Sequence, residues 1–184
     1  MRAGLEHARL HALLVLALAA CGTDAARDEP VAEAEAAMAG ETIDACSLLS
    51  PEQVSAAVGE PMNAGTLAEH GGRAGESYFS TCTYAAVAET SLAAVTITVR
   101  PSPEITDPTA ALEAQVADMR ANVMPDYRLE PVEGLGAAAG WDPSLSQLTA
   151  FRSGLALLVD VGGPLSDRRR AAVELARIAL QAAH

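Results

Sequence analysis

The chain has 184 residues, enough for one domain with a hydrophobic core once any targeting segment is removed. It carries 12 basic residues, all of them arginine, against 24 acidic residues, and its formal net charge is −12. This balance opposes binding to nucleic acid, because phosphate contacts need a positive surface. The lack of lysine excludes a Walker phosphate loop, a Schiff-base lysine and a Ser-x-x-Lys acylation site.

Residues 1–20 have the three parts of an export signal. The start is basic, an apolar run extends from Leu10 to Leu18, and two alanines precede Cys21. The run is too short to span a bilayer as a stable helix. A cysteine directly after small residues resembles the bacterial lipobox, which implies that Cys21 receives a diacylglyceryl group and becomes the first residue of the mature protein. The alternatives are an ordinary secretory signal in which this cysteine occurs by chance, or a short buried helix.

The anchored protein is expected in the cell envelope, where it faces the periplasm or the exterior. In Gram-negative lipoproteins an aspartate after the anchor usually implies retention at the inner membrane. Gly22 stands at that position, which favours the outer membrane if the organism has one. Residues 21–43 predict a flexible acidic tether, because they contain many acids and almost no large apolar residues to bury.

Residues 44–184 are predicted to form a single extracytoplasmic domain that begins with a helix. Ser50 can cap this helix, Gln53 can complete a capping box, and Gly59 would end it. Residues 62–77 are rich in glycine and alanine and are expected to form a long loop.

Two strands are predicted next, over residues 78–86 and 91–100. In the second strand apolar residues alternate with polar ones from Val95 to Arg100. This period of two indicates an antiparallel sheet with one face in water.

The second half of the domain is predicted to continue with a helix, strands and a last helix. Asp107 opens a helix whose apolar stripe consists of Leu112, Val116, Met119 and Val123. Four strands are expected near 127–132, 137–141, 146–152 and 155–161, and Ser166 or Asp167 would cap the final helix. The order helix, strands, helix, strands, helix predicts an α+β fold with the helices packed on one face of an antiparallel sheet.

Cys46 and Cys82 are the two cysteines that remain once Cys21 carries lipid. A pair of cysteines outside the cytoplasm favours a disulfide, which would join the start of the first helix to the first strand. The alternative is a metal site that includes His70, but two thiolates and one histidine without close C-x-x-C spacing make a poor zinc signature. We therefore predict a disulfide, no metal and no cofactor.

The chain reads Asp-Ala-Cys-Ser-Leu-Leu-Ser-Pro-Glu-Gln-Val over residues 44–54 and Cys-Thr-Tyr over residues 82–84. These segments resemble a family of uncharacterised bacterial lipoproteins, best known from actinobacteria. Mature domains of that family open with Cys-Ser-Leu-Leu and carry a second cysteine before an aromatic residue, and residues 134–141 with the hairpin after them are also similar. The resemblance implies an extracytoplasmic domain of unknown function, without catalytic residues to carry over.

Few residues are suited to catalysis. Only His70 and His184 remain as histidines after removal of the signal, and there is no G-x-S-x-G elbow, H-E-x-x-H motif or calcium-loop spacing. Acidic residues are plentiful, so a carboxylate pair stays open as the basis of a hydrolase.

Two segments are candidates for binding. The loop around His70 and Arg73 is rich in glycine, and functional residues often lie on such loops, although a solvated surface loop is the alternative. Arg168, Arg169 and Arg170 lie in the first turn of the last helix, where the helix dipole disfavours positive charge. They are candidates for contact with an acidic partner or lipid headgroups, unless a neighbouring aspartate and solvent simply screen them.

The sequence therefore predicts a lipid-anchored envelope protein with a binding or structural role and no enzymatic activity. Its partners would be the membrane, through the lipid, and either another envelope protein or a small ligand. An envelope hydrolase that uses a carboxylate pair is the alternative.

Overall fold

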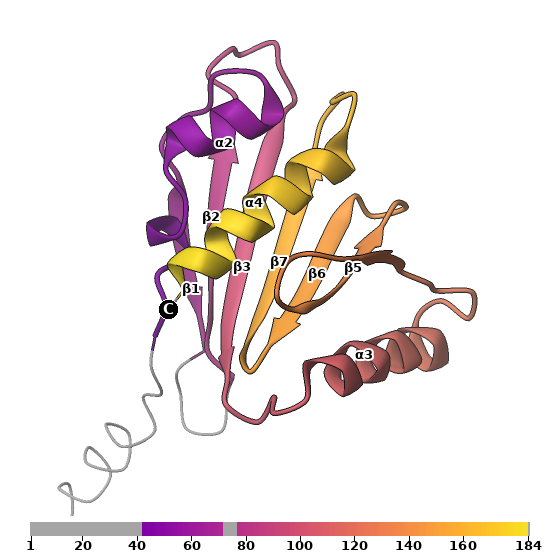
Figure 1. The fold of residues 1–184 in the computed structure, drawn as a ribbon. Coiled ribbons are helices and arrows are strands. Elements are labelled where there is room, and N and C mark those ends of the chain that lie inside the picture. Colours follow the sequence, from indigo (N-terminus) through magenta and orange to yellow (C-terminus); the bar gives the residue numbers. More distant parts are fainter. Residues whose placement is uncertain (1–41, 72–76, 184) are drawn as a thin grey trace, which may run out of the picture.

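The computed structural model describes residues 42–71 and 77–183, and these residues form a mixed α+β fold (Figure 1). The helices are η1 (Ala45–Ser47, a 3-10 turn), α2 (Pro51–Val58), α3 (Pro108–Asn122) and α4 (Arg168–Ala182). The strands are β1 (Thr66–His70), β2 (Phe79–Ala85), β3 (Ala94–Ser102), β4 (Glu130–Val132), β5 (Ala138–Asp142), β6 (Gln147–Arg152) and β7 (Gly154–Gly162). Cys21, with the predicted signal peptide and almost all of the tether, lies outside the described residues.

The described strands form one antiparallel sheet in the order β1-β2-β3-β7-β6-β5-β4. The first three strands meet the others where β3 pairs with β7, from Ala94 opposite Gly162 to Ser102 opposite Gly154. This is the central pairing of the sheet, and it brings segments from the two halves of the chain side by side (Figure 1).

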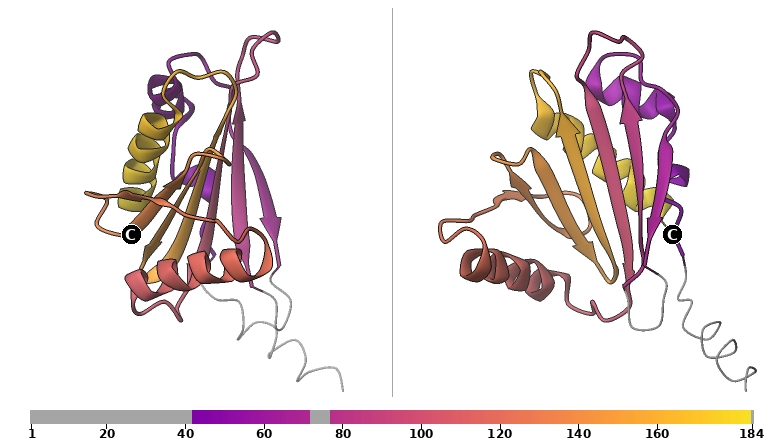
Figure 2. Two further views of the ribbon diagram at one scale, coloured as in Figure 1. Left: turned by 90° about the vertical axis from the view of Figure 1, so that its right-hand side faces the viewer. Right: turned by 180° about the vertical axis from the view of Figure 1, so that it is seen from behind.

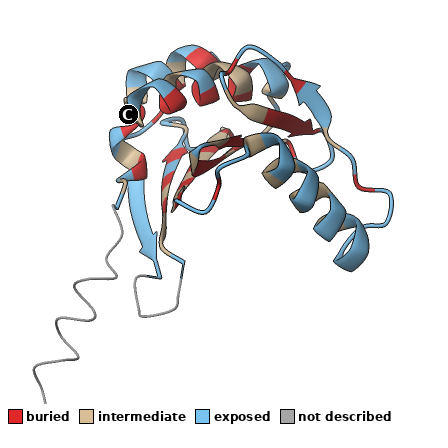
Figure 3. Cartoon of the chain, turned by 60° about the horizontal axis from the view of Figure 1, so that its bottom comes forward, coloured by how far each residue is buried: buried red, intermediate tan, exposed pale blue. Residues whose placement is uncertain are grey.

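One face of the sheet is covered by α4 and α2 (Figure 1). Val95, Ile97 and Val99 of β3 point to this face and are fully buried, as the alternation in the sequence predicts. The small alanines of α4 let the helix lie close to the strands, so this face forms the main core (Figure 3). The buried residues of α4 are Ala171, Ala172, Leu175, Ala176, Ala179 and Leu180.

The expectation that the helices share one face is not confirmed, because α3 packs against the opposite face. Consecutive residues of β6 mark the two sides: Ala150 belongs to the main core, whereas Phe151 forms a separate buried cluster with Ile105 and Ala156. Ala111 of α3 packs against that second cluster. Since successive side chains of a strand point to opposite faces, α3 lies on the side away from α4 (Figure 3).

The loop predicted over 62–77 contains a strand, β1, which pairs with β2 at the edge of the sheet. All of its residues are exposed, so it lacks the apolar alternation that reveals a strand in the sequence. Just before β1, the backbone at Gly65 passes close to the disulfide. A Cβ atom at this position would lie 2.2 Å from the Sγ atom of Cys82, so a larger residue would clash there. Residues 72–76 of the predicted loop lie outside the described residues.

Cys46 and Cys82 form the predicted disulfide, with their Cα atoms 4.9 Å apart. The bridge joins η1 to β2, and a hydrogen bond of 2.7 Å from the Tyr84 hydroxyl to the Leu49 carbonyl reinforces the same junction. Ile43, assigned to the tether from the sequence, already packs against the core. The ordered domain therefore begins slightly earlier than expected.

The helices begin at the residues that the sequence predicts. Ser50 and Gln53 form the capping box of α2. The carboxylates of Asp107 and Asp167 accept hydrogen bonds from the first backbone amides of α3 and α4. These caps satisfy backbone groups that a helix start leaves without a partner.

Replacing both bridged cysteines, Cys46→Ala with Cys82→Ala, is expected to lower the free energy of unfolding by about 3–4 kcal/mol, because the bridge closes a long loop in the unfolded chain. Urea unfolding of the oxidised wild type and the variant measures this loss. Reducing agent should bring the wild type to the stability of the variant and leave the variant unchanged. Equal stability of variant and oxidised wild type would show that the bridge does not stabilise the fold.

Candidate functional site

The described helices cover the face of the sheet away from α4 only in part. α3 contacts β5 and β6, and Leu129 fills the space left by Gly140, where a Cβ would lie 2.6 Å from the Leu129 Cβ. Seen from behind, β1, β2 and β3 lie in front of α2 and α4, with no described helix over them (Figure 2). Threonines line this bare part, and the hydroxyls of Thr81 and Thr98 share a hydrogen bond of 3.0 Å.

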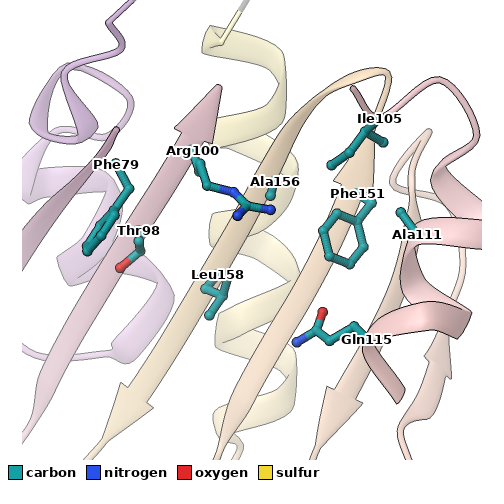
Figure 4. Close-up of a pocket in the computed structure, with 9 residues that line it drawn as sticks. All are labelled: Phe79, Thr98, Arg100, Ile105, Ala111, Gln115, Phe151, Ala156 and Leu158. Carbon is teal, nitrogen blue, oxygen red and sulfur yellow. The ribbon is translucent and has the colours of Figure 1, made fainter. Parts of the chain in front are cut away.

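A cavity of about 440 Å³ lies where the covered and bare parts of this face meet (Figure 4). Strands supply its floor and α3 supplies one wall. Most of its lining is apolar, and its volume is typical of a small-molecule site. The lining residues are Phe79, Thr98, Arg100, Ile105, Ala111, Gln115, Phe151, Ala156 and Leu158.

The cavity exists because α3 makes only shallow contact with the sheet. No residue of α3 is fully buried. Leu112, in the predicted apolar stripe, is only partly buried, and Val123, at the end of that stripe, is 64% exposed. Towards the cavity the helix presents Ala111, whose methyl group is too small to fill the space.

Both ends of the helical wall are fixed. Before α3, the Ile105 carbonyl accepts a hydrogen bond of 2.9 Å from the Gly154 amide, and Asp107 caps the helix. Near its end, the Nε atom of Arg120 donates to the Tyr127 carbonyl at 2.7 Å. These contacts tie α3 to the segments on either side of it and hold the cavity open.

Two polar side chains of the lining are available to a ligand. Arg100 and Gln115 point over the floor of the cavity from opposite sides (Figure 4). The Oε1 atom of Gln115 is buried and has no hydrogen-bond partner among the described residues. Arg100 is half-buried and forms no ion pair with any described residue.

His70, a predicted binding residue, lies next to this cavity. It ends β1 and stacks on Phe79, with the two ring centroids 4.7 Å apart. Phe79 lines the cavity, so one aromatic ring separates His70 from it. Arg73, predicted together with His70, lies outside the described residues, and its role stays a prediction.

Arg168, Arg169 and Arg170 contact their own chain. Arg168 donates to the turn between β5 and β6, Arg169 pairs with Glu130 of β4 at 3.6 Å, and Arg170 donates to the last turn of α2. These contacts link α4 to three neighbouring segments. Binding of an acidic partner or of lipid headgroups by these arginines stays a prediction.

A second hollow, of about 640 Å³ and more polar, lies between the end of α3 and the turn after β5. Asp142 and Asp126 both line it. The Oδ1 atom of buried Asp142 accepts hydrogen bonds from the amides of Ser144 and Leu145 and so shapes the turn, whereas Asp126 is exposed. Burial, and then the nearby Asp142 carboxylate, raise the pKa of Tyr127 in the same hollow.

The sequence contains only part of the signal for the cavity. The period of two along β3 places Thr98 and Arg100 on the polar face, and an arginine that follows threonines on one strand face is the available clue. Gln115 has no such signal, because glutamine is common on helix surfaces. Phe79 and Phe151 come from distant strands, and only the sheet order brings them to one cavity.

Among the described residues, no helix combines the length and the apolar character needed to cross a membrane. Nor do three or more histidine, cysteine, aspartate or glutamate side chains gather there into a potential metal site. Comparisons with family models, curated proteins and solved structures find no match to this chain. The family resemblance of the sequence thus stays a prediction, and function has to be inferred from the chemistry of the cavity.

Asp160 of β7 lies on the same face of the sheet as the cavity. The Nε2 atom of Gln147 donates to its Oδ1 atom at 2.8 Å. Burial raises the pKa of Asp160, and the hydrogen bond from Gln147 opposes that shift only in part. A carboxyl whose pKa is raised by folding binds its proton more tightly in the folded state, so its ionisation lowers stability as the pH rises through the folded pKa.

Asp160→Asn is therefore expected to raise the free energy of unfolding at neutral pH, because the amide keeps an oxygen to accept from Gln147 and carries no buried charge. The gain should shrink as the pH falls towards 3.8, the ordinary pKa of the carboxyl. Urea unfolding of both proteins across this pH range tests it. A gain in the free energy of unfolding that does not vary with pH, or a loss of stability at neutral pH, would contradict the expected role of Asp160 ionisation.

Proposed function

We propose that this protein is a lipid-anchored binding protein of the cell envelope, without enzymatic activity, and that it holds a small apolar ligand between α3 and the sheet. The observation that carries the proposal is the cavity itself. It is a mostly apolar hollow of about 440 Å³, on a sheet face that the described helices cover only in part. Each Å² of apolar surface removed from water there contributes roughly 25 cal/mol to binding.

The chemistry of the lining supports binding rather than catalysis. Among the described residues that line the cavity there is no histidine, cysteine or carboxylate. The hydroxyl of Thr98 is shared with Thr81. General acid–base and nucleophilic catalysis need such groups within reach of the substrate. In the second hollow, which Asp126 and Asp142 line, one oxygen of Asp142 is already engaged in the turn.

The proposed envelope location is supported by the position of Cys21 and by the disulfide between the other two cysteines. Cys21 follows a segment with the features of an export signal. The Cys46–Cys82 disulfide suits an oxidising compartment outside the cytoplasm, since structural disulfides persist there and are rare in the cytosol. Two or three acyl chains on Cys21 would hold the protein firmly on a membrane, because each buried methylene contributes roughly 0.8 kcal/mol.

Filling the cavity should abolish binding. The full chain with Cys21→Ser, in buffer without detergent, is expected to bind the neutral fluorescent probe N-phenyl-1-naphthylamine. Ala111→Trp should weaken that binding by about tenfold or more, because the indole occupies the space that the alanine leaves. Titration of the probe fluorescence measures both affinities.

The matched control for this test is Ala114→Trp, which places the same side chain on an exposed position of the same helix. It should leave the affinity for the probe unchanged. The proposed cavity function fails if the unsubstituted protein does not bind the probe, or if the two tryptophan variants bind it equally well.

The anchor is tested separately in cells that express the full chain. Radioactive palmitate should label the wild type and not Cys21→Ser, because the proposed acyl chains are attached through that sulfur. Cys46→Ala with Cys82→Ala serves as the control and should still be labelled. Equal labelling of the wild type and Cys21→Ser would rule out the anchor and leave the cavity function standing.

A further inference from the structure

Arg100 has an unusual setting among the described arginines. The guanidinium groups of Arg100, Arg128 and Arg177 form no hydrogen bond or ion pair with any described residue, unlike those of the others. Arg128 and Arg177 are exposed, so water solvates them. Arg100 is half-buried and lines the cavity.

The surroundings of Arg100 are apolar. Its register partner on β7 is Ala156, and its guanidinium extends over β7 between Ala156 and Leu158 (Figure 4). No carboxylate belongs to the described lining of the cavity. A cation partly withdrawn from water is stabilised by an anion that pairs with it, since the charge loses hydration on burial.

We propose that the ligand of this cavity is a monoanionic amphiphile, an acyl chain with a terminal carboxylate, and that the carboxylate pairs with Arg100. The inference rests on the proposed binding function and names its class of ligand. The planar guanidinium matches a carboxylate with two parallel hydrogen bonds. The acyl chain would lie over Leu158 and Phe151 on the apolar floor of the cavity.

Other classes of ligand fit these features less well. A neutral amphiphile would cover Arg100 without supplying a partner for its charge, and a cationic amphiphile would be repelled by it. A polyanion would meet a chain of net charge −12, and Arg100 is the one arginine among the described lining residues that could offset the repulsion. A single negative charge on a long apolar body matches both the charge and the lining of the cavity.

The test compares three ligands that share one chain: dodecanoate, dodecanol and dodecylammonium. Each displaces N-phenyl-1-naphthylamine from the full chain with Cys21→Ser, at neutral pH, below its micelle concentration and without detergent. Dodecanoate should bind about tenfold more tightly than dodecanol, and dodecylammonium should bind most weakly, because one charge-assisted contact distinguishes them.

Variants at Arg100 separate its charge from its bulk. Arg100→Gln should weaken the affinity for dodecanoate by about tenfold and leave the affinity for dodecanol within about twofold. Arg100→Lys should keep part of the preference for the acid, because it retains the charge but not the two parallel hydrogen bonds. Arg128→Gln, at an exposed arginine outside this cavity, is the control and should leave all three affinities unchanged. Thermal unfolding of each variant checks that the fold is retained.

The outcomes distinguish the two proposals. If the neutral probe does not bind the protein, the proposed function is wrong. If the probe binds and none of the three ligands displaces it, the inference about ligand class is overturned. A third outcome is that dodecanoate and dodecanol bind with equal affinity, or that Arg100→Gln leaves the ratio of their affinities unchanged. In either case the cavity binds apolar ligands without recognising a carboxylate, and the inference about ligand class is overturned. A preference for dodecylammonium would overturn it as well.

Discussion

The antiparallel pairing of β3 with β7 is the contact on which the rest of the structure depends, because it joins β1 and β2 to β6, β5 and β4. Its register decides which side chains face α4 and which face the cavity. Val95, Ile97 and Val99 are buried on one side, whereas Thr98 and Arg100 lie on the other. A shift of one residue would exchange these two sets and place a guanidinium in the core. The core and the cavity are therefore two consequences of one register.

The two faces differ because the helices on them differ in how closely they can approach. α4 presents alanines and leucines that are fully buried, so its backbone lies near the strands and leaves little space. α3 has no fully buried residue, and its ends are tied to neighbouring segments by the Asp107 cap and the bond from Arg120 to Tyr127. A helix held at both ends and packed shallowly leaves a hollow between itself and the sheet. Threonines on the strands that no described helix covers suit contact with water, as is usual for one face of an antiparallel sheet.

The sequence was informative where structure depends on local chemistry and uninformative where it depends on distant contacts. Caps at Ser50, Asp107 and Asp167 and the alternation along β3 depend on neighbouring residues, so the helix starts and the faces of β3 could be predicted. β1 could not be predicted because all of its residues are exposed and the strand is held by pairing with β2. The face of the sheet on which α3 packs, and the cavity beneath this helix, could not be predicted for a related reason. They depend on how β2, β3, β6 and β7 are ordered in the sheet, which no single segment specifies.

The acidic chain and the arginine in the cavity act on a ligand at different ranges. The net charge of −12 repels an approaching anion, but salt at physiological strength screens that repulsion beyond about 8 Å. Inside the cavity the dielectric is lower and screening is weaker, so the attraction of Arg100 dominates at contact. A small polar anion gains only this contact. An anion with an acyl chain gains in addition roughly 0.8 kcal/mol of binding free energy for each methylene that it buries. This gain offsets the repulsion between the anion and the acidic chain. The combination of an acidic chain with Arg100 in an apolar hollow therefore selects for amphiphilic monoanions over small or highly charged ones.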